Sequence, residues 1–384
     1  MSEGNKIIGI LAFSNEEGGG IYQYTQSIID ALKFDSGRKY VIFCKEKDTR
    51  FDSLNLEVRK LPERNISTWL KLIEYFLVFV NLRNSISFSK SELKSFEDID
   101  LFLCPSISLY PHFFLRKPFI FTLHDMQERY YPHFFSKKER FFRNLSAKAL
   151  SFEAETIICE SRFVKNDIIK FLGVSKDKIV CIESPPPEEF LNFKFENIRT
   201  KDVIKKYKLP KKYIFYPAQC WPHKNHVNLV EAFNIIKSSH PDVYMVFIGS
   251  QKDSFFKLMA RIKELKLEKR VLHLGYIDYD DLPYLYKQSQ MLVMPSLFES
   301  VSIPVFEAFA IGTPVCCSNV VALPEQVGDA GVIFDPNDVY DIADKISFLL
   351  SNEIIRKDLI LKGIERVSNF NHENYRVKLN KLFK

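Results

Sequence analysis

Apolar and polar positions alternate in blocks along the whole chain. Short apolar runs such as IIGILAF, FIFTL and MLVM are each followed by a longer stretch whose apolar side chains recur at helical spacing. Parallel strands that are covered on both faces read as continuous apolar runs, and the helices that connect them are amphipathic. The alternation therefore predicts β–α–β units from end to end, and the predicted fold class is α/β.

The first half of the chain contains one series of these units. Its apolar runs predict strands at Ile7–Phe13, Tyr40–Cys44, Leu101–Cys104, Phe119–Leu123, Thr156–Cys159 and Ile179–Ile182. Helices are predicted between them, including Ile21–Leu32, Arg140–Ala149 and Arg162–Phe171. Gly173 follows the last of these helices and is a typical helix stop.

A break in the pattern separates the two halves. Pro185, Pro186 and Pro187 are consecutive and can continue neither a helix nor a strand ladder, and the polar stretch up to Pro210 shows no strand pattern. We therefore place a domain boundary near residues 185–205. The expected parts are an N-terminal Rossmann-like domain at 1–190, a C-terminal Rossmann-like domain at 205–365, and a C-terminal helix at 366–384.

The pattern restarts after the break. Strands are predicted at Tyr213–Tyr216, Val243–Ile248, Val271–Leu274, Met291–Met294, Val315–Ser318 and Val332–Phe334. Helices are predicted at Val227–Lys237, Phe255–Glu264, Leu282–Gln288, Pro304–Ala310 and Tyr340–Leu350. Open parallel sheets bind ligands at the carboxyl ends of their strands, so the loops that follow the strands are where function is expected.

Composition agrees with two globular domains. A chain of 384 residues with 46% hydrophobic residues can bury two ordinary cores. The formal charge of +6, from 54 basic and 48 acidic residues, is too small to suggest a nucleic-acid partner. The seven cysteines form no CxxC pair and lie in or beside apolar runs, so we expect buried thiols in a reducing compartment.

No segment has the character of a signal peptide or a membrane span. Met1–Lys6 leads directly into the first strand, and the most membrane-like run, Trp69–Val80, is too short to cross a bilayer and carries two charges. We expect a buried or interfacial helix there, and a cytoplasmic protein that is soluble or peripheral to a membrane.

The stretch ESVSIPVFEAFAIGTPV contains several candidate ligand-binding groups close together. It follows the strand Met291–Met294, and it contains Glu299 before a predicted helix and Glu307 about one turn inside it. The backbone N–H groups of Ser300, Val301 and Ser302 are expected to be unpaired donors at the helix start, which suits a phosphate. Either both glutamates belong to a solvated face, or Glu307, set among apolar residues, needs a ligand hydroxyl as its partner.

This stretch resembles the group 1 (family 4) retaining glycosyltransferases. The resemblance rests on the Glu-x7-Glu spacing and on the downstream IGTPV and LPE segments, Ile311–Val315 and Leu323–Glu325. It implies the GT-B fold, in which two Rossmann-like domains face each other across a cleft. In that fold the N-terminal domain lies on the acceptor side and the C-terminal domain binds the nucleotide sugar. The resemblance also implies that the C-terminal helix packs back on the N-terminal domain. It also implies that Glu307 holds the ribose hydroxyls of the nucleotide and that Glu299 contacts hydroxyls of the transferred sugar.

A second family signature follows the first strand of the C-terminal half, in FYPAQCWPHKNH. The resemblance implies that an arginine and, five residues later, a lysine hold the donor diphosphate. Lys224 matches the lysine, but Gln219 stands at the arginine position. Because glutamine donates a hydrogen bond but carries no charge, Lys224 and the helix start are expected to carry more of the leaving-group stabilisation.

The remaining candidate residues lie in other strand-to-helix loops. Gly18, Gly19 and Gly20 open the first helix, and Gly19 and Gly20 allow close approach of a ligand to the backbone, unless the three form only a flexible turn. His124 ends the strand Phe119–Leu123, where the family places a residue that contacts the sugar. Tyr276 and Ile277 lie where the family contacts the base, although an ordinary loop fits this segment equally well.

The resemblance implies transfer of a sugar from a nucleoside diphosphate sugar, such as a GDP-mannose-like donor or a UDP-sugar, to a glycan or lipid-linked acceptor hydroxyl. Neither a metal nor another cofactor is expected, and surface polysaccharide or lipopolysaccharide synthesis is the expected pathway. Two alternatives stay open: a binding protein that no longer transfers, which Gln219 favours, and an epimerase of nucleotide sugars with the same architecture.

An aromatic and basic stretch adds a further expectation. Between Arg129 and Lys148 the sequence has six basic side chains and one acidic side chain, with paired phenylalanines among them. The segment Arg129–Asn144 is either a solvated amphipathic helix or a surface that meets anionic lipid. Since many members of the family act on lipid-linked acceptors, we expect peripheral contact with the inner face of the membrane.

Overall fold

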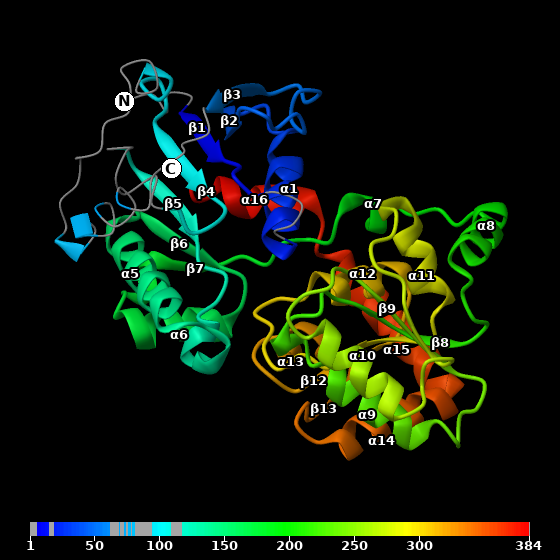
Figure 1. Cartoon of the computed structure of the whole chain (residues 1–384). Coiled ribbons are helices and arrows are strands. Elements are labelled where there is room, and N and C mark those ends of the chain that lie inside the picture. The colour runs from blue at the N-terminus through cyan, green and yellow to red at the C-terminus, as the bar shows by residue number, and fades with distance from the viewer. Residues whose placement is uncertain are drawn as a thin grey trace. The chain divides into compact units, whose positions relative to one another are not determined.

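The computed structural model describes residues 6–14, 19–61, 69, 73, 76–77, 79–80, 94–108 and 117–383. The chain divides into two compact units (Figure 1). The first contains Met1–Ser184 together with His372–Lys384, and the second contains Pro185–Asn371. Gly18 and most of Trp69–Val80 lie outside the described residues. Of those that are described, Trp69, Phe76 and Phe79 are exposed, whereas Leu77 is buried.

The first unit is built on a parallel sheet. Among the described residues it has seven strands in the order β3-β2-β1-β4-β5-β6-β7. The strands are β1 (Ile7–Leu11), β2 (Lys39–Lys45), β3 (Glu57–Leu61), β4 (Leu101–Cys104), β5 (Phe119–Thr122), β6 (Thr156–Cys159) and β7 (Ile179–Cys181). The helices of this unit whose bounds fall in the described ranges are α1 (Gly20–Leu32), α5 (Lys137–Glu153), α6 (Arg162–Leu172) and α16 (His372–Asn380).

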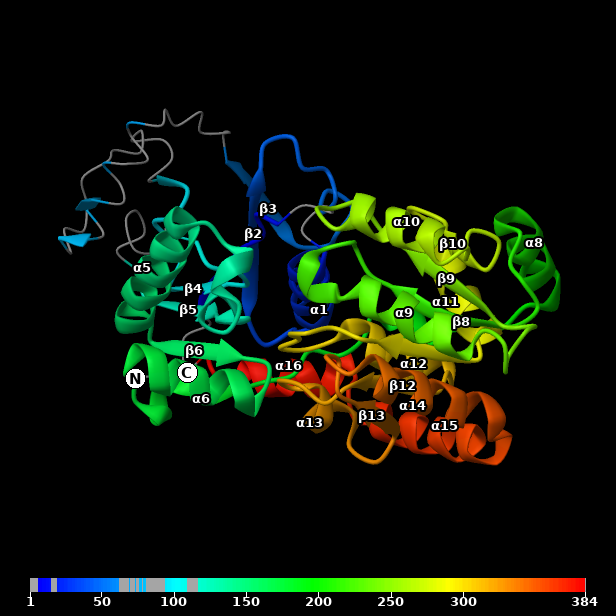
Figure 2. The same ribbon diagram turned by 60° about the horizontal axis from the view of Figure 1, so that its bottom comes forward.

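Helices cover both faces of this sheet, as Figures 1 and 2 show. Ile8 and Ile10 of β1 pack in one cluster with α1 and α16, whereas Leu11 packs in another cluster with α5 and α6. Side chains of a strand point alternately to its two faces, so a strand that is apolar throughout needs cover on both sides. The helix α5 starts earlier than predicted because Ser136 and Glu139 form a capping box ahead of it.

The end of the chain completes the core of the first unit. Tyr375, Leu379 and Phe383 are almost fully buried in the cluster that also contains α1. In addition, the Asn380 amide donates a hydrogen bond of 3.1 Å to Asp35, which follows α1. The helix α16 is therefore part of the first unit although its residues follow the whole second unit in the sequence.

The second unit repeats the architecture. In its described residues a six-stranded parallel sheet has the order β10-β9-β8-β11-β12-β13. The strands are β8 (Tyr213–Pro217), β9 (Tyr244–Ile248), β10 (Val271–His273), β11 (Met291–Met294), β12 (Val315–Ser318) and β13 (Gly331–Phe334). The helices are α7 (Glu188–Leu191), α8 (Asn197–Tyr207), α9 (His226–Ile236), α10 (Phe255–Glu264), α11 (Leu282–Gln288), α12 (Ile303–Ile311), α13 (Leu323–Val327), α14 (Val339–Ser351) and α15 (Glu353–Ser368).

The predicted α/β class is confirmed, and most predicted strands agree with the structure to within two residues. The strand β3 was not predicted, because three of the five residues in its sequence EVRKL are charged and it offers no apolar run. It pairs with β2 at the sheet edge, where charged side chains are common. The helix α15 was not predicted either. Only Leu359, Gly363 and Val367 of this helix are buried, so its apolar pattern is weak.

The strand order of the second unit indicates where a ligand can bind. In the second unit, β8 and β11 are neighbours, but the connections after them run to opposite ends of the sheet, from β8 to β9 and from β11 to β12. Such a switch point leaves a crevice at the carboxyl ends of the two strands. The loops after β8 and β11 contain Lys224 and Glu299.

Candidate functional site

Lys224 and Glu299 are joined at this switch point. The Lys224 ammonium forms an ion pair with Glu299 Oε1, although the two residues lie on loops after different strands. Glu299 is buried, and the same oxygen accepts a hydrogen bond of 2.8 Å from the Ser296 hydroxyl. The Tyr216 hydroxyl donates to the Lys224 carbonyl oxygen at 2.9 Å. A cation and a carboxylate are thereby held at the carboxyl edge of the sheet.

The loop that carries Lys224 is held by Asn225. This residue adopts the left-handed conformation with φ 58°, which asparagine tolerates better than most residues. Its side-chain amide donates to the carbonyl oxygens of Pro295 and Pro336, at 3.0 and 2.9 Å. Burial lowers the pKa of the neighbouring His223 and His226 to about 3, so both are neutral at pH 7 and add no charge beside Lys224.

Glu307 is a buried carboxylate with one free oxygen. Its side chain is on α12 and only 2% exposed, and Oε2 accepts a hydrogen bond of 2.6 Å from the Tyr286 hydroxyl. Oε1 is buried and has no hydrogen-bond partner within the described part of the chain. Burial raises the pKa of Glu307 to about 7, and the Tyr286 bond opposes that rise. An unpaired buried acceptor is unfavourable, so Oε1 is suited to a ligand donor.

The backbone before α12 differs in part from the prediction. No described acceptor takes the N–H of Ser300 or Val301, as expected. The N–H of Ser302, however, donates to Gln326 Oε1 at 2.9 Å, and the Gln326 amide donates back to the Ser302 carbonyl oxygen at 2.6 Å. The prediction that Ser302 offers a free N–H was therefore wrong, because a side chain from α13 occupies it.

The other predicted residues of the second unit lie in the loops after β8 and β10. Gln219 is half-buried beside Trp221. Tyr276 has an exposed side chain, whereas the Ile277 side chain is partly buried against the core.

In the first unit, His124 lies at the end of β5 with both ring nitrogens bonded. Nδ1 is 2.9 Å from Glu160 Oε2, and Nε2 is 2.8 Å from the carbonyl oxygen of Pro105. Glu160 is buried and also accepts a hydrogen bond from Ser184 at 2.8 Å. Burial acts to lower the pKa of His124, but the Glu160 carboxylate and the Pro105 carbonyl outweigh it, so the pKa is raised. Both ring nitrogens face acceptors, an arrangement that favours the protonated form of the ring.

The glycines at the start of α1 allow close approach to the backbone. Gly19 precedes the helix with φ 56° and ψ −120°, a conformation that favours glycine. A Cβ atom at Gly20 would meet nothing within 4 Å.

Comparison with known proteins identifies the family. Residues 197–366 match the family of glycosyl transferases group 1, and residues 19–185 match glycosyltransferase family 4. Together the two matches cover most of the chain. The chain belongs to the group 1 (family 4) glycosyltransferases.

Relatives of this glycosyltransferase include two mannosyltransferases. O-antigen chain mannosyltransferase B of Escherichia coli is 31% identical over 226 residues, which are 58% of this chain and 58% of the relative. The alignment thus spans less than two thirds of that relative's length. O-antigen chain mannosyltransferase RfbU of Salmonella typhimurium is 26% identical over 332 residues, covering 84% of this chain and 85% of the relative.

A solved structure supports the fold. HepE from Anabaena, in complex with UDP and glucose, superposes with a TM-score of 0.77 at 18% identity and covers 98% of both chains. This likeness confirms the GT-B fold class that was expected for the glycosyltransferase.

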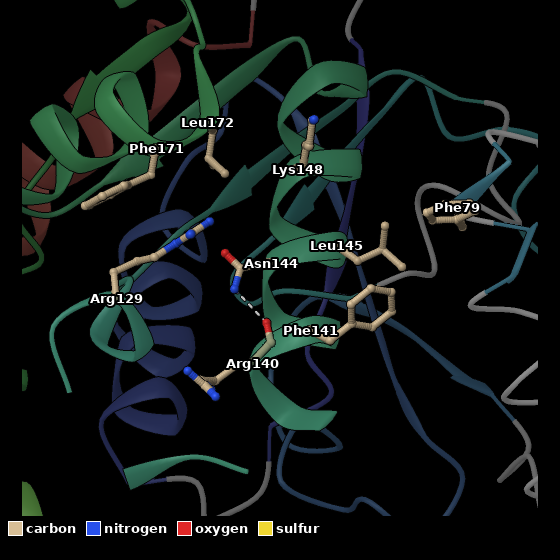
Figure 3. Close-up of a pocket in the computed structure, with 9 residues that line it drawn as sticks. All are labelled: Phe79, Arg129, Arg140, Phe141, Asn144, Leu145, Lys148, Phe171 and Leu172. Atoms are coloured by element: carbon tan, nitrogen blue, oxygen red, sulfur yellow. Dashed lines mark hydrogen bonds between the residues drawn. The ribbon is translucent and has the colours of Figure 1, made fainter. Parts of the chain in front are cut away.

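The glycosyltransferase also has a pocket beside α5, which we call the α5 pocket (Figure 3). Its volume is about 400 Å³. It is lined by Phe79, Arg129, Arg140, Phe141, Asn144, Leu145, Lys148, Phe171 and Leu172. Arg140 Nε and Asn144 Oδ1 are buried without a hydrogen-bond partner in the described ranges. Figure 3 shows the cationic and apolar side chains that line the pocket.

Across the residues that are described, no three His, Cys, Asp or Glu side chains are grouped as metal ligands. None of the helices in those ranges combines the length and the apolar character that crossing a bilayer requires.

Several residues that shape the site were not singled out from the sequence of this glycosyltransferase. They are Glu160, Tyr286, Ser296, Asn225 and Gln326. Glu160 and Ser296 follow strands β6 and β11 closely, so the rule that sites gather at the carboxyl ends of strands could have found them. Tyr286 and Gln326 lie on helices, where no local pattern marks their contacts.

Proposed function

We propose that this chain transfers a glycosyl group from a nucleoside diphosphate sugar to an acceptor hydroxyl, with retention of the anomeric configuration. The observation that carries the proposal is the unpaired, buried Oε1 of Glu307, in the same unit as the Lys224–Glu299 ion pair. A ribose hydroxyl would give this oxygen the donor that it lacks.

The second unit has groups for each part of a nucleotide sugar. We assign the ribose to Glu307 and a hydroxyl of the transferred sugar to Glu299. Lys224 and the free N–H groups of Ser300 and Val301 would meet the diphosphate, since an ammonium and backbone donors stabilise phosphate charge.

The other predicted residues of the second unit are assigned to separate parts of the donor. Gln219 would donate a hydrogen bond to the diphosphate. Tyr276 and the backbone of Ile277 would lie beside the base. The Oγ of Ser302, buried and without a partner among the described residues, would face the donor.

In the first unit, we assign Gly19 and Gly20 to close approach of a ligand to the backbone. A sugar hydroxyl would replace the Pro105 carbonyl as the partner of His124 Nε2.

In the proposed reaction, the bond between the anomeric carbon and the donor phosphate oxygen breaks while the acceptor oxygen bonds to the same carbon from the same face. The leaving phosphate oxygen takes the acceptor proton, so no protein base is assigned. Lys224 and the amides before α12 would stabilise the charge that develops on the leaving diphosphate, without a metal ion.

The acceptor and donor are proposed from the relatives. The names of the two mannosyltransferases support transfer of a sugar in O-antigen or other surface polysaccharide synthesis. A GDP-mannose-like donor or a UDP-sugar fits these names and the UDP complex of HepE. The acceptor would be a glycan or a lipid-linked sugar.

Binding and transfer assays on two variants test the proposal. Glu307→Ala should weaken the binding of GDP or UDP in calorimetry, because the ribose loses its acceptor. Lys224→Ala should mainly lower the rate of transfer to a lipid-linked glycan acceptor. Lys212→Ala is the control, since Lys212 forms an exposed ion pair with Asp242 in the same unit. Unchanged binding and rate in both site variants would falsify the assignment.

The same assays separate the alternatives. A binding protein would bind GDP or UDP without transferring a sugar from the corresponding donor to any acceptor. An epimerase would convert the donor sugar in the absence of an acceptor.

The α5 pocket supports peripheral contact with a membrane through Arg129–Asn144. Phe79 and Phe141 at the pocket are 66% and 55% exposed. No described carboxylate forms an ion pair with Arg129, Arg140 or Lys148. Exposed aromatic rings beside unpaired cations suit the headgroups of anionic lipid. We propose that this surface places the protein at the inner face of the membrane.

Flotation with vesicles tests the membrane contact. Binding is expected to vesicles that contain phosphatidylglycerol and to be weaker with phosphatidylcholine alone. The double variant Arg140→Glu/Lys148→Glu should lose the binding, whereas Lys176→Glu, an exposed charge reversal in the same unit, should retain it. Absence of binding to either kind of vesicle would exclude the proposal.

A further inference from the structure

Gln219 replaces a charged residue of the family signature, and the structure shows how its amide is oriented. The indole Nε1–H of Trp221 donates to Gln219 Oε1 at 3.0 Å. Because an indole nitrogen only donates, the oxygen of the Gln219 amide must face it. The NH₂ group of Gln219 is left without a partner among the described residues, and it can donate to a phosphate oxygen.

A lysine lies against the same indole. Lys252 Nζ is 5.2 Å from the centroid of the Trp221 ring. Within the described ranges, Lys252 makes no ion pair with a carboxylate. A cation over an aromatic ring at a partly exposed site gains only about 0.5–1 kcal/mol. A charge-assisted bond to a phosphate is stronger, so the ammonium can turn from the ring to an anion.

The backbone brings Lys252 to Gln219. Gly249, at the end of β9, has φ 116°, and a Cβ atom there would lie 2.9 Å from Gln219 N and from backbone atoms of Ala218. Only glycine permits this approach of the two loops. Cys220 N–H donates to the Ser250 carbonyl oxygen at 3.1 Å, and Ser254 N–H donates to the Cys220 carbonyl oxygen at 3.0 Å. The loop that carries Lys252 is therefore bonded to the loop that carries Gln219.

The groups around Lys224 supply little net positive charge for a diphosphate. The ammonium of Lys224 is already paired with Glu299, and His223 and His226 are neutral at pH 7. The pair by itself presents little net positive charge to a diphosphate. Lys252 is the nearby cation whose charge no described carboxylate neutralises.

We propose that Gln219 and Lys252, joined by Trp221, together replace the arginine of the family signature. Gln219 supplies the hydrogen bond and Lys252 supplies the positive charge that the diphosphate of the donor requires. This inference rests on the proposed function, because it assumes that the diphosphate binds beside Lys224.

Affinities for nucleotides and nucleosides test the assignment. Lys252→Ala should weaken the binding of GDP or UDP about tenfold, as expected for one bond to a charged group, and leave the binding of guanosine or uridine unchanged. Lys252→Arg should retain the affinity. Lys257→Ala is the control, because Lys257 is an exposed lysine on α10, the next helix.

A second variant distinguishes a charge from a structural role. Adding Gln219→Arg to Lys252→Ala should restore the affinity for the diphosphate, because the arginine returns the missing charge to the position that the family uses. Unchanged GDP and UDP affinity in Lys252→Ala, an equal loss for the nucleosides, or no rescue by Gln219→Arg would each overturn the proposal.

The test of Lys252 can fail without the proposed glycosyltransferase function failing. If Glu307→Ala weakens nucleotide binding and Lys252→Ala does not, only the role of Lys252 fails. If the unmodified protein binds neither GDP nor UDP, both proposals fail.

Discussion

The ionisation of Glu307 is expected to change when a nucleotide binds. Its carboxyl is buried, its pKa is raised to about 7, and one of its oxygens has no described partner. A ribose hydroxyl that donates to Oε1 would favour the ionised form and lower this pKa in the complex. Below pH 7, nucleotide binding would then have to release a proton from Glu307.

We therefore predict that the affinity for GDP or UDP rises with pH. Between pH 6 and pH 8 the rise should be about tenfold and should level off above pH 7, since one pKa unit corresponds to a factor of ten. Calorimetry at pH 6, 7 and 8 measures it.

Glu307→Gln provides the matched control, because a glutamine keeps the shape of the side chain but does not titrate. The second ionisation of the terminal phosphate affects both proteins equally, so the difference between them isolates Glu307. A slope that is the same in Glu307→Gln and in the unmodified protein would contradict the assignment.

At the scale of elements, the site depends on how closely two strand-to-helix loops approach. The loops after β8 and β9 meet where Gly249 touches the backbone of Gln219. The loops after β8 and β11 meet through the amide of Asn225, which donates to Pro295. These contacts join segments far apart in the sequence, and they place Lys224 at the end of the sheet.

Gly249→Ala should destabilise the second unit by about 2–6 kcal/mol, because a backbone conformation reserved for glycine and a steric clash add together. Gly275→Ala is the control: Gly275 also has a positive φ, of 71°, but a Cβ atom there would meet nothing within 4 Å. Its loss should be only about 1–2 kcal/mol. Urea unfolding measures the free energy of unfolding of both variants. Equal decreases would show that the contact between the loops does not contribute to stability.

At the scale of the whole molecule, the chain crosses between its two units twice. The first unit ends at Ser184 and resumes at His372, and the returning segment contributes Tyr375 and Phe383 to its core. The core of the second unit is complete within Pro185–Asn371.

Removal of residues 372–384 should therefore destabilise the first unit and leave the second unit folded. Phe383→Ala alone should cost about 3–5 kcal/mol, the usual loss for a buried phenylalanine. Val377→Ala, at a position of α16 that is 49% exposed, should change little. The free energy of unfolding of each unit is measured by denaturant unfolding, and GDP or UDP binding reports whether the second unit stays intact. Loss of nucleotide binding in the truncated chain would contradict the prediction.

Much of this glycosyltransferase follows from local sequence patterns. Apolar runs of strand length separated by amphipathic stretches determine the α/β class, and the consecutive prolines at Pro185–Pro187 mark the boundary between the units. The Glu-x7-Glu spacing and Lys224 point to the family because both elements depend only on residues close together in the sequence.

The rest depends on contacts between distant segments, which only the tertiary structure decides. Gln326 occupies the N–H of Ser302, Glu160 holds His124, and Tyr286 leaves one oxygen of Glu307 unpaired. Local patterns report which face of an element is apolar, but not which side chain from another element fills a given hydrogen bond. The donors and acceptors that remain free for a substrate are therefore set by the packing of the elements, even though the residues that carry them can be read from the sequence.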